Sequence, residues 1–186
     1  MNPIFAAALE LQGFCEGQGW RFCFIGAVAV LRWGEPRLTQ GVDLTLLTGW
    51  GSEASFVDPL LARFSRRRPD ARDFALRFRV LLLESSQRIP LDISLGAMPF
   101  EGRAVERASD FEIGEGAALR TCSAEDLIVF KAFAGRPQDW LDIEGIAARQ
   151  AGRLDSDLVW RELRPLFKLK DEPETEDRLR SILEDV

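Results

Sequence analysis

Two short segments in the first half of the chain alternate between apolar and polar residues, and they limit the fold more than any other feature. Residues 41–47 read GVDLTLL and residues 89–95 read IPLDISL. Side chains two positions apart in a strand lie on the same face of the sheet. Each segment is therefore predicted to be a β-strand with one buried apolar face, and the opposite face carries Asp43 in the first strand and Asp92 in the second.

The segments around these strands are predicted to be mostly helical. Apolar residues recur with a helical period over 3–17, whereas 20–25 is a short apolar run that favours a strand. The chain order then predicts an α+β fold, with a mixed or antiparallel sheet in residues 1–120 and a helical part in residues 121–186. The remaining predicted elements are helices at 27–33 and 53–66, a hairpin of strands 74–84 and 89–95, and helices at 123–134, 137–150, 155–167 and 174–184.

Composition indicates an ordinary folded protein of 186 residues, with 46% hydrophobic and 29% charged residues. No apolar run reaches the roughly 18 residues that a membrane helix needs, so we expect no membrane association. The first residues lack the basic region of a secretory signal. Three cysteines without C-x-x-C spacing are typical of reduced thiols, so we expect a cytoplasmic location.

Residue counts also exclude several classes of chemistry. The chain has no histidine and no tyrosine, which rules out a Ser-His-Asp triad and histidine zinc sites. Carboxylates, Lys, Arg, Ser, Thr and backbone amides remain, a set that suits hard metal ions and phosphates. The net charge of −6 disfavours broad nucleic-acid binding. We interpret the arginine-rich segment 66–79 as a solvated helix end followed by a half-exposed strand.

Asp43 and Asp92 are the strongest candidates for a functional site. Burying a lone carboxylate is costly unless it is paired or bound to a metal. If the two strands are neighbours, about 4.8 Å apart, both side chains can converge on one cation. Mg²⁺ would suit such a pair, because it prefers oxygen ligands and completes its shell with phosphate and water. The alternative is that both carboxylates face solvent on the open side of the sheet.

Residues 24–47 read FIGAVAVLRWGEPRLTQGVDLTLL. This stretch resembles the opening of the DNA polymerase beta-like nucleotidyltransferase superfamily, and in particular its abortive-infection or toxin-type minimal branch. That family has a strand ending in Gly-Gly or Gly-Ser, a helix, an Arg-x-Thr-x-Asp-h-Asp-h motif (h is apolar) and a third Asp on a later strand. Gly26 matches the first glycine, Arg37 and Thr39 match the Arg-x-Thr, and Asp43 and Asp92 match the second and third Asp.

The resemblance covers about residues 20–150 and implies a minimal nucleotidyltransferase fold, with a mixed sheet of about four or five strands flanked by helices. It implies that Asp43 and Asp92 bind Mg²⁺ and are catalytic, and that a nucleoside triphosphate is bound by Gly26, Ala27, Arg37, Thr39 and Lys131. A nucleotidyl group would then pass to a hydroxyl acceptor on RNA or protein. The later segment 123–142 resembles the one that these proteins carry after the sheet.

Two positions depart from the family pattern. Ala27 replaces the second Gly or Ser, and Gly41 replaces the first Asp of the pair, so one metal ligand is missing. This loss should cost several kcal/mol of catalytic barrier. The alternative is therefore a catalytically impaired binding or regulatory module, such as a toxin–antitoxin component with a cognate partner protein. A scaffold that uses exposed Trp33, Trp50 and Trp140 is a third hypothesis.

Several matched residues also have structural interpretations. Gly26 is compatible with simple turn geometry, and Thr39 with a strand cap. Arg37 could pair with Asp43 or with phosphate. Lys131 shares the inward stripe of its predicted helix, where it could contact a triphosphate or extend past the rim of the core. For Arg136, Asp139 and Asp142 we favour structural salt bridges on one helical face.

Overall fold

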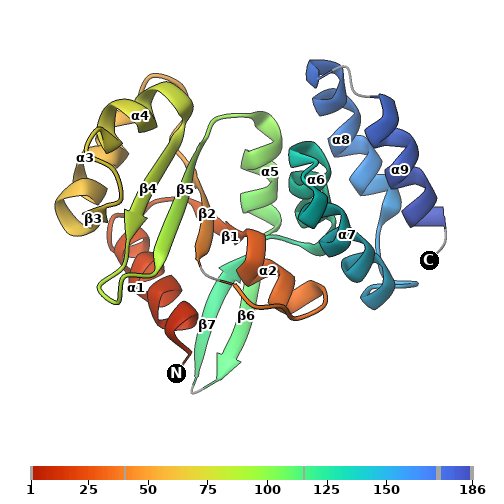
Figure 1. The fold of residues 1–186 in the computed structure, drawn as a ribbon, viewed down its shortest axis with the longest axis horizontal. Helices are drawn as coiled ribbons and strands as arrows, with labels where there is room; N and C mark the ends of the chain where they lie inside the picture. Colours follow the sequence, from red (N-terminus) through yellow and green to blue (C-terminus); the bar gives the residue numbers. More distant parts are fainter. Residues whose placement is uncertain (1, 40, 115, 171–172, 185–186) are drawn as a thin grey trace.

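The computed structural model describes residues 2–39, 41–114, 116–170 and 173–184. Strands and helices alternate through the first two thirds, and helices complete the chain (Figure 1). The strands are β1 (Phe22–Ile25), β2 (Val42–Leu47), β3 (Ser65–Arg66), β4 (Val80–Glu84), β5 (Pro90–Gly96), β6 (Ser109–Gly114) and β7 (Ala117–Thr121). The helices are α1 (Pro3–Gly17), α2 (Gly26–Trp33), α3 (Ala54–Arg63), α4 (Ala71–Phe78), α5 (Pro99–Arg107), α6 (Ala124–Ala134), α7 (Pro137–Arg149), α8 (Ser156–Lys170) and α9 (Pro173–Glu184).

The strands form one mixed sheet in the order β3-β4-β5-β2-β1-β7-β6. The pairs β2–β5 and β1–β7 are parallel, and the other neighbours are antiparallel. The two alternating segments of the sequence are thus the adjacent central strands β2 and β5. Their register places Asp43 directly opposite Asp92. The predicted α+β class with a mixed sheet is confirmed.

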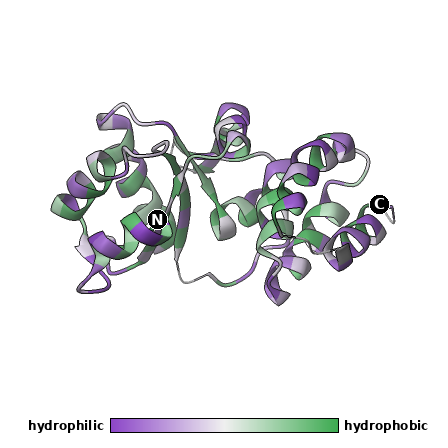
Figure 2. Cartoon of the chain, turned by 90° about the horizontal axis from the view of Figure 1, so that it is seen from above, coloured by the Kyte–Doolittle hydropathy of each residue, from purple (hydrophilic) through white to green (hydrophobic). Residues whose placement is uncertain are grey.

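Helices cover both faces of this sheet and enclose two apolar cores. On one face, α1, α3 and α4 bury side chains such as Leu11, Leu60 and Ala75 against the strands. On the other, α2, α5 and the C-terminal helices pack together through side chains such as Val30 and Leu127. Seen from above, the sheet separates these groups, with the N-terminus on one side and the C-terminus on the other (Figure 2).

Local sequence signals set the helix ends near the cavity described below. The Ser123 side chain accepts a hydrogen bond from the Asp126 N–H and caps α6. Gly135 ends α6 in the left-handed conformation, with φ 68°. Pro137 then occupies the first turn of α7. This sharp turn brings the start of α7 back beside the end of α6.

Three predictions about the elements need correction. The strand predicted over 74–84 is a strand only from Val80, because Ala71 and Ala75 give 71–78 a small buried stripe with helical spacing. Helix α5 and the β6–β7 hairpin were not predicted. With this hairpin and with β3, the sheet has seven strands over the described residues, compared with the four or five expected.

The surface differs from one expectation about tryptophans. Trp50 is 70% exposed, but Trp140 is buried and Trp33 is partly buried with its indole N–H bonded to the Cys122 carbonyl. A scaffold built on all three side chains is therefore not supported. Within the described residues, the helices are too short or too polar for any of them to cross a membrane.

Candidate functional site

A cavity of about 650 Å³ opens where the central strands meet α2, α6 and the start of α7. This volume lies within the range of small-molecule sites. The charged side chains that line this cavity come from the sheet and from the helices and loops that face it. The wall includes all of the site residues that the sequence predicts: Gly26, Ala27, Arg37, Thr39, Asp43, Asp92 and Lys131.

The acidic pair lies in this wall. Asp43 on β2 and Asp92 on β5 are opposite one another in register, and both line the cavity, so they share one face of the sheet. Asp43 is partly buried, and burial together with the neighbouring Asp92 charge raises its pKa. The Ala27 N–H and the charges of Lys131 and Arg136 act in the opposite direction. The arrangement places two like charges side by side, one of them partly buried.

Gly26 permits the close contact between the β1–α2 junction and the acidic pair. Its φ is +58°, a conformation that favours glycine. A Cβ at this position would lie 2.6 Å from Asp43 Cγ and closer still to Oδ2. The backbone N–H of Ala27 hydrogen-bonds the Asp43 carboxylate. Gly26 thus meets a turn requirement and also makes space for Asp43.

A second cluster of charged side chains joins α6, α7 and the loop after α2. Lys131 Nζ donates to Asp142 Oδ2 at 2.6 Å and to Asp139 Oδ1 at 3.2 Å. Arg37 forms a two-pronged pair with Asp142, at 2.8 and 3.1 Å. Arg136 Nε pairs with Asp139 at 2.8 Å. The three bases outnumber the two carboxylates by one charge.

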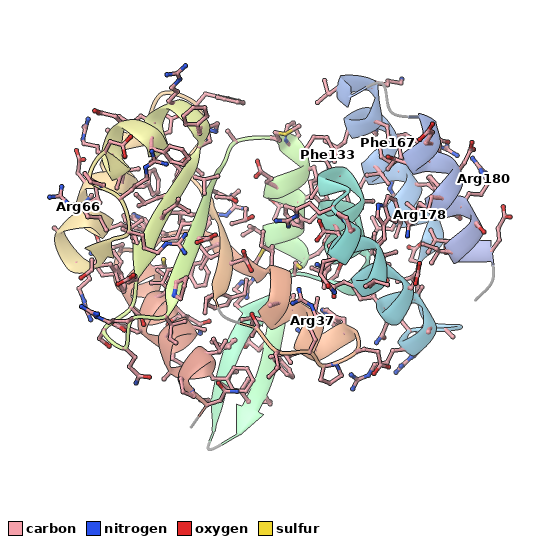
Figure 3. All side chains as sticks on the ribbon, viewed as in Figure 1. Arg37, Arg66, Phe133, Phe167, Arg178 and Arg180 are labelled. Carbon is pink, nitrogen blue, oxygen red and sulfur yellow. The ribbon has the colours of Figure 1, made fainter. Side chains whose placement is uncertain are left out.

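Of the two alternatives for Arg37, the pair with Asp43 is not found, because Arg37 contacts Asp142 (Arg37 is labelled in Figure 3). The salt-bridge interpretation of Arg136, Asp139 and Asp142 is confirmed. Burial alone would raise the pKa of Asp142, but hydrogen bonds from Arg37 and Lys131 outweigh burial and lower it.

The accessibility of the bases differs. Lys131 is only 5% exposed and does not extend past the rim of the core. Its ammonium group is already shared by two carboxylates. The Arg136 side chain is 75% exposed while it lines the cavity. Arg136 is therefore the base of this group that can reach a ligand with the least rearrangement. The family resemblance included both residues, but it implied phosphate binding for Lys131, whereas we favoured structural salt bridges for Arg136.

Arg67 is a site residue that the sequence interpretation missed. Its Nη2 donates to Asp92 Oδ1 at 2.7 Å, and it lines the cavity. Our interpretation of segment 66–79 as a solvated helix end followed by a half-exposed strand did not place Arg67 in the site. The sequence shows a basic run before a strand expected to pair with that of Asp92, but it does not give the register that brings Arg67 to Asp92.

Gly41 and Thr39 define the cavity rim where the family pattern would place another carboxylate. The Thr39 hydroxyl donates to the Gly41 carbonyl at 3.1 Å, a local contact that fits the strand-cap interpretation. A Cβ at Gly41 would lie 3.2 Å from the Pro90 carbonyl oxygen, so an Asp would fit only with a small shift of its neighbours.

Asp43 and Asp92 are the carboxylates available to the Mg²⁺ that the resemblance implies. Asp43 and Asp92 face one another and suit one hard cation. In the part of the chain that the structure describes, no group of three or more acidic or thiol side chains is placed to hold a metal. The residues present therefore fit one Mg²⁺ at most, and do not fit a two-metal centre.

Comparisons with known proteins give matches in structure only. No protein-family model and no curated protein sequence matches the chain. Among solved structures, an antigenic nucleotidyltransferase-like protein from Paracoccidioides brasiliensis is 15% identical, with a TM-score of 0.48, over 95% of this chain and 91% of that one. The lincosamide antibiotic adenylyltransferase LnuA, with lincomycin bound, is 13% identical, with a TM-score of 0.49, over 76% and 94%.

The antibiotic-resistance factor ANT(2'')-Ia matches over nearly the full length of both chains. The TM-score is 0.50 at 17% identity, covering 94% of this chain and 95% of that one. At this identity the likeness concerns the fold, and it agrees with the mixed sheet and flanking helices that the family resemblance implied. The chain therefore has a fold similar to that of ANT(2'')-Ia.

Proposed function

We propose that this protein binds a nucleoside triphosphate in the cavity between the central strands and the α6–α7 turn. The observation that carries the proposal is the in-register pair Asp43 and Asp92 on β2 and β5, facing bases from other elements across one cavity. A polyphosphate needs several positive groups, and a carboxylate pair beside them serves to bind a cation or to orient a hydroxyl. A neutral or purely apolar ligand would use neither feature.

The chain's own residues divide the work of holding the ligand. Arg136, exposed at the start of α7, would contact the phosphates, and Arg37 would do so while it keeps its bond to Asp142. The buried Lys131 would act as a fixed positive charge behind them. Gly26 leaves room for the Asp43 carboxylate beside the N-terminus of α2.

For the transfer step, one Mg²⁺ would be held by Asp43 and Asp92, in competition with the contact of Asp92 with Arg67. When bound, it would neutralise phosphate charge and polarise the phosphoryl group under attack. The reaction that this supports is transfer of a nucleotidyl group from the triphosphate to a hydroxyl acceptor on RNA or protein, with release of pyrophosphate and of the hydroxyl proton.

A second candidate function is a binding or regulatory module without turnover, for example one that acts with a cognate partner protein. Gly41 favours it, because this position adds no carboxylate to the pair. Both functions require the same triphosphate site. They differ in whether two carboxylates suffice for the chemical step.

Binding is tested by calorimetric titration with ATP, GTP, CTP and UTP, and with inorganic triphosphate as a probe of the phosphate site. Loss of one charge-assisted contact in Arg136→Gln should weaken binding about tenfold. Arg164→Gln on the exposed side of α8 is the matched control and should bind like the wild type. Equal affinity of all three proteins would remove the phosphate role of Arg136, and no binding by the wild type would remove the proposed function.

Turnover is tested by transfer of label from nucleotides carrying a radioactive α-phosphate to total RNA and to protein. We expect Gly41→Asp to transfer at least tenfold faster than the wild type, because a carboxylate returns to the metal side of the pair. Binding without transfer by either protein would favour the module.

A further inference from the structure

Arg67 contacts Asp92 in the way that a metal cation would. The contact is direct, 2.7 Å from Nη2 to Oδ1, and about a quarter of the Arg67 side chain is exposed. Charge-assisted hydrogen bonds of this length are among the stronger polar contacts in proteins. Asp92 is therefore already neutralised by a side chain of the same molecule.

The sheet explains how Arg67 reaches this carboxylate. Its backbone N–H donates to the Leu82 carbonyl and continues the pairing of β3 with β4. Leu82 is opposite Asp92, and Asp92 is opposite Asp43, so these residues form one row across the sheet. Neighbouring strands lie about 4.8 Å apart. A side chain as long as arginine is needed to extend over β4 and contact Asp92.

The acidic pair therefore has positive charge on two sides. Arg67 contacts the Asp92 side, and Lys131 and Arg136 act on Asp43 from the helical side. Gly41 contributes no further negative charge at the rim. The two carboxylates beside the triphosphate site are thus accompanied by bases of the protein without any ion being added.

We propose that Arg67 takes the place of a divalent cation at Asp92, so that the cavity binds a triphosphate without a metal ion. The contact of Arg67 is with Oδ1 of Asp92, so a metal ion at this carboxylate would have to compete with the Arg67 charge. This inference rests on the proposed function, since it concerns how the triphosphate site is balanced electrically.

The test compares ATP binding with EDTA and with excess Mg²⁺ for the wild type, Arg67→Gln and Arg66→Gln. Arg66 is the matched control, because it is exposed, lies outside this cavity and points away at the outer edge of the molecule (Figure 3). For the wild type and Arg66→Gln we expect affinities that agree within about twofold in the two buffers. Arg67→Gln should lose about tenfold in EDTA and regain most of it with Mg²⁺, which can then bind the freed Asp92.

The outcomes distinguish a failure of the inference about Arg67 from a failure of the proposed function. Wild-type binding that needs Mg²⁺ overturns the inference and leaves the proposed function standing, and this arm requires no variant to fold. Metal-independent binding that Arg67→Gln does not weaken also overturns it, because another group would then supply the charge. No wild-type binding in either buffer overturns the proposed function itself.

Discussion

At the scale of single residues, the acidic pair is a source of instability within a stable sheet. Asp43 is partly buried and faces Asp92 in register, and both burial and this neighbour raise its pKa. A carboxyl whose pKa is higher in the folded than in the unfolded chain binds its proton more tightly when folded. Its ionisation therefore lowers the free energy of unfolding as pH rises through the raised pKa.

The first prediction follows from this sign. Asp43→Asn should unfold at a higher urea concentration than the wild type at neutral pH, because the amide keeps an acceptor for the Ala27 N–H without the charge. The difference should shrink as pH falls below the ordinary aspartate pKa, where Asp43 is protonated in both states. Urea unfolding followed by tryptophan fluorescence across that range measures it. A gain that does not change with pH would contradict the assigned cause.

The second prediction concerns Gly26. Gly26→Ala should cost about 1 kcal/mol for the left-handed backbone and more for the contact with Asp43. Gly152→Ala is the control, since its φ is +70° and a Cβ there meets nothing within 4 Å. Urea unfolding of both variants separates backbone strain from the clash. Equal losses would show that Asp43 moves aside without cost.

At the scale of elements, the α6–α7 pair is joined by charges in a place where apolar contacts would be usual. Lys131 is buried and contacts Asp139 and Asp142, while Arg37 and Arg136 contact the same carboxylates from outside. Removing one partner of a buried ion pair leaves uncompensated charge. The turn between the helices therefore depends on a cation at position 131.

The third prediction tests this dependence. Lys131→Met should lower the free energy of unfolding by about 3 kcal/mol, the lower end for breaking a buried pair, because both arginines still contact the carboxylates. Arg21→Ala removes an exposed pair with Glu106 and should cost less than about 1 kcal/mol. Urea unfolding of both variants measures the difference. Similar small losses would mean that the buried network adds little.

The elements that the sequence predicted best are those with a strict period. Alternation in residues 41–47 and 89–95 located β2 and β5, and with them the faces of Asp43 and Asp92. Helix α4 was missed because Phe74, Leu76 and Phe78 alternate like a strand, whereas Leu76 and Phe78 are exposed in the structure. The contact between Arg67 and Asp92 could not be predicted either, because it depends on the register of β3, a strand of two residues.

At the scale of the whole molecule, the cavity lies where the sheet meets the C-terminal helices. Its wall takes Asp43 and Asp92 from the sheet, Lys131 from α6 and Arg136 from the start of α7. A ligand in this cavity would contact both parts, and a ligand that binds only the folded chain stabilises it according to its concentration.

The fourth prediction uses this linkage. ATP at one hundred times its dissociation constant should raise the free energy of unfolding by about 2.7 kcal/mol. Adenosine at the same concentration should raise it far less, because the charged side chains of the cavity contact phosphates in the proposed complex. Thermal unfolding with each compound measures both effects. Equal stabilisation by the two would place recognition on the base and sugar instead.

The one-row arrangement of Arg67, Leu82, Asp92 and Asp43 has a consequence for altering the protein. The carboxylates sit on the two middle strands, whose spacing is fixed by backbone hydrogen bonds, whereas every base reaches them from an edge strand, a loop or a helix. Substitutions of these bases can therefore change which anion the protein binds, while the distance between Asp43 and Asp92 stays constant.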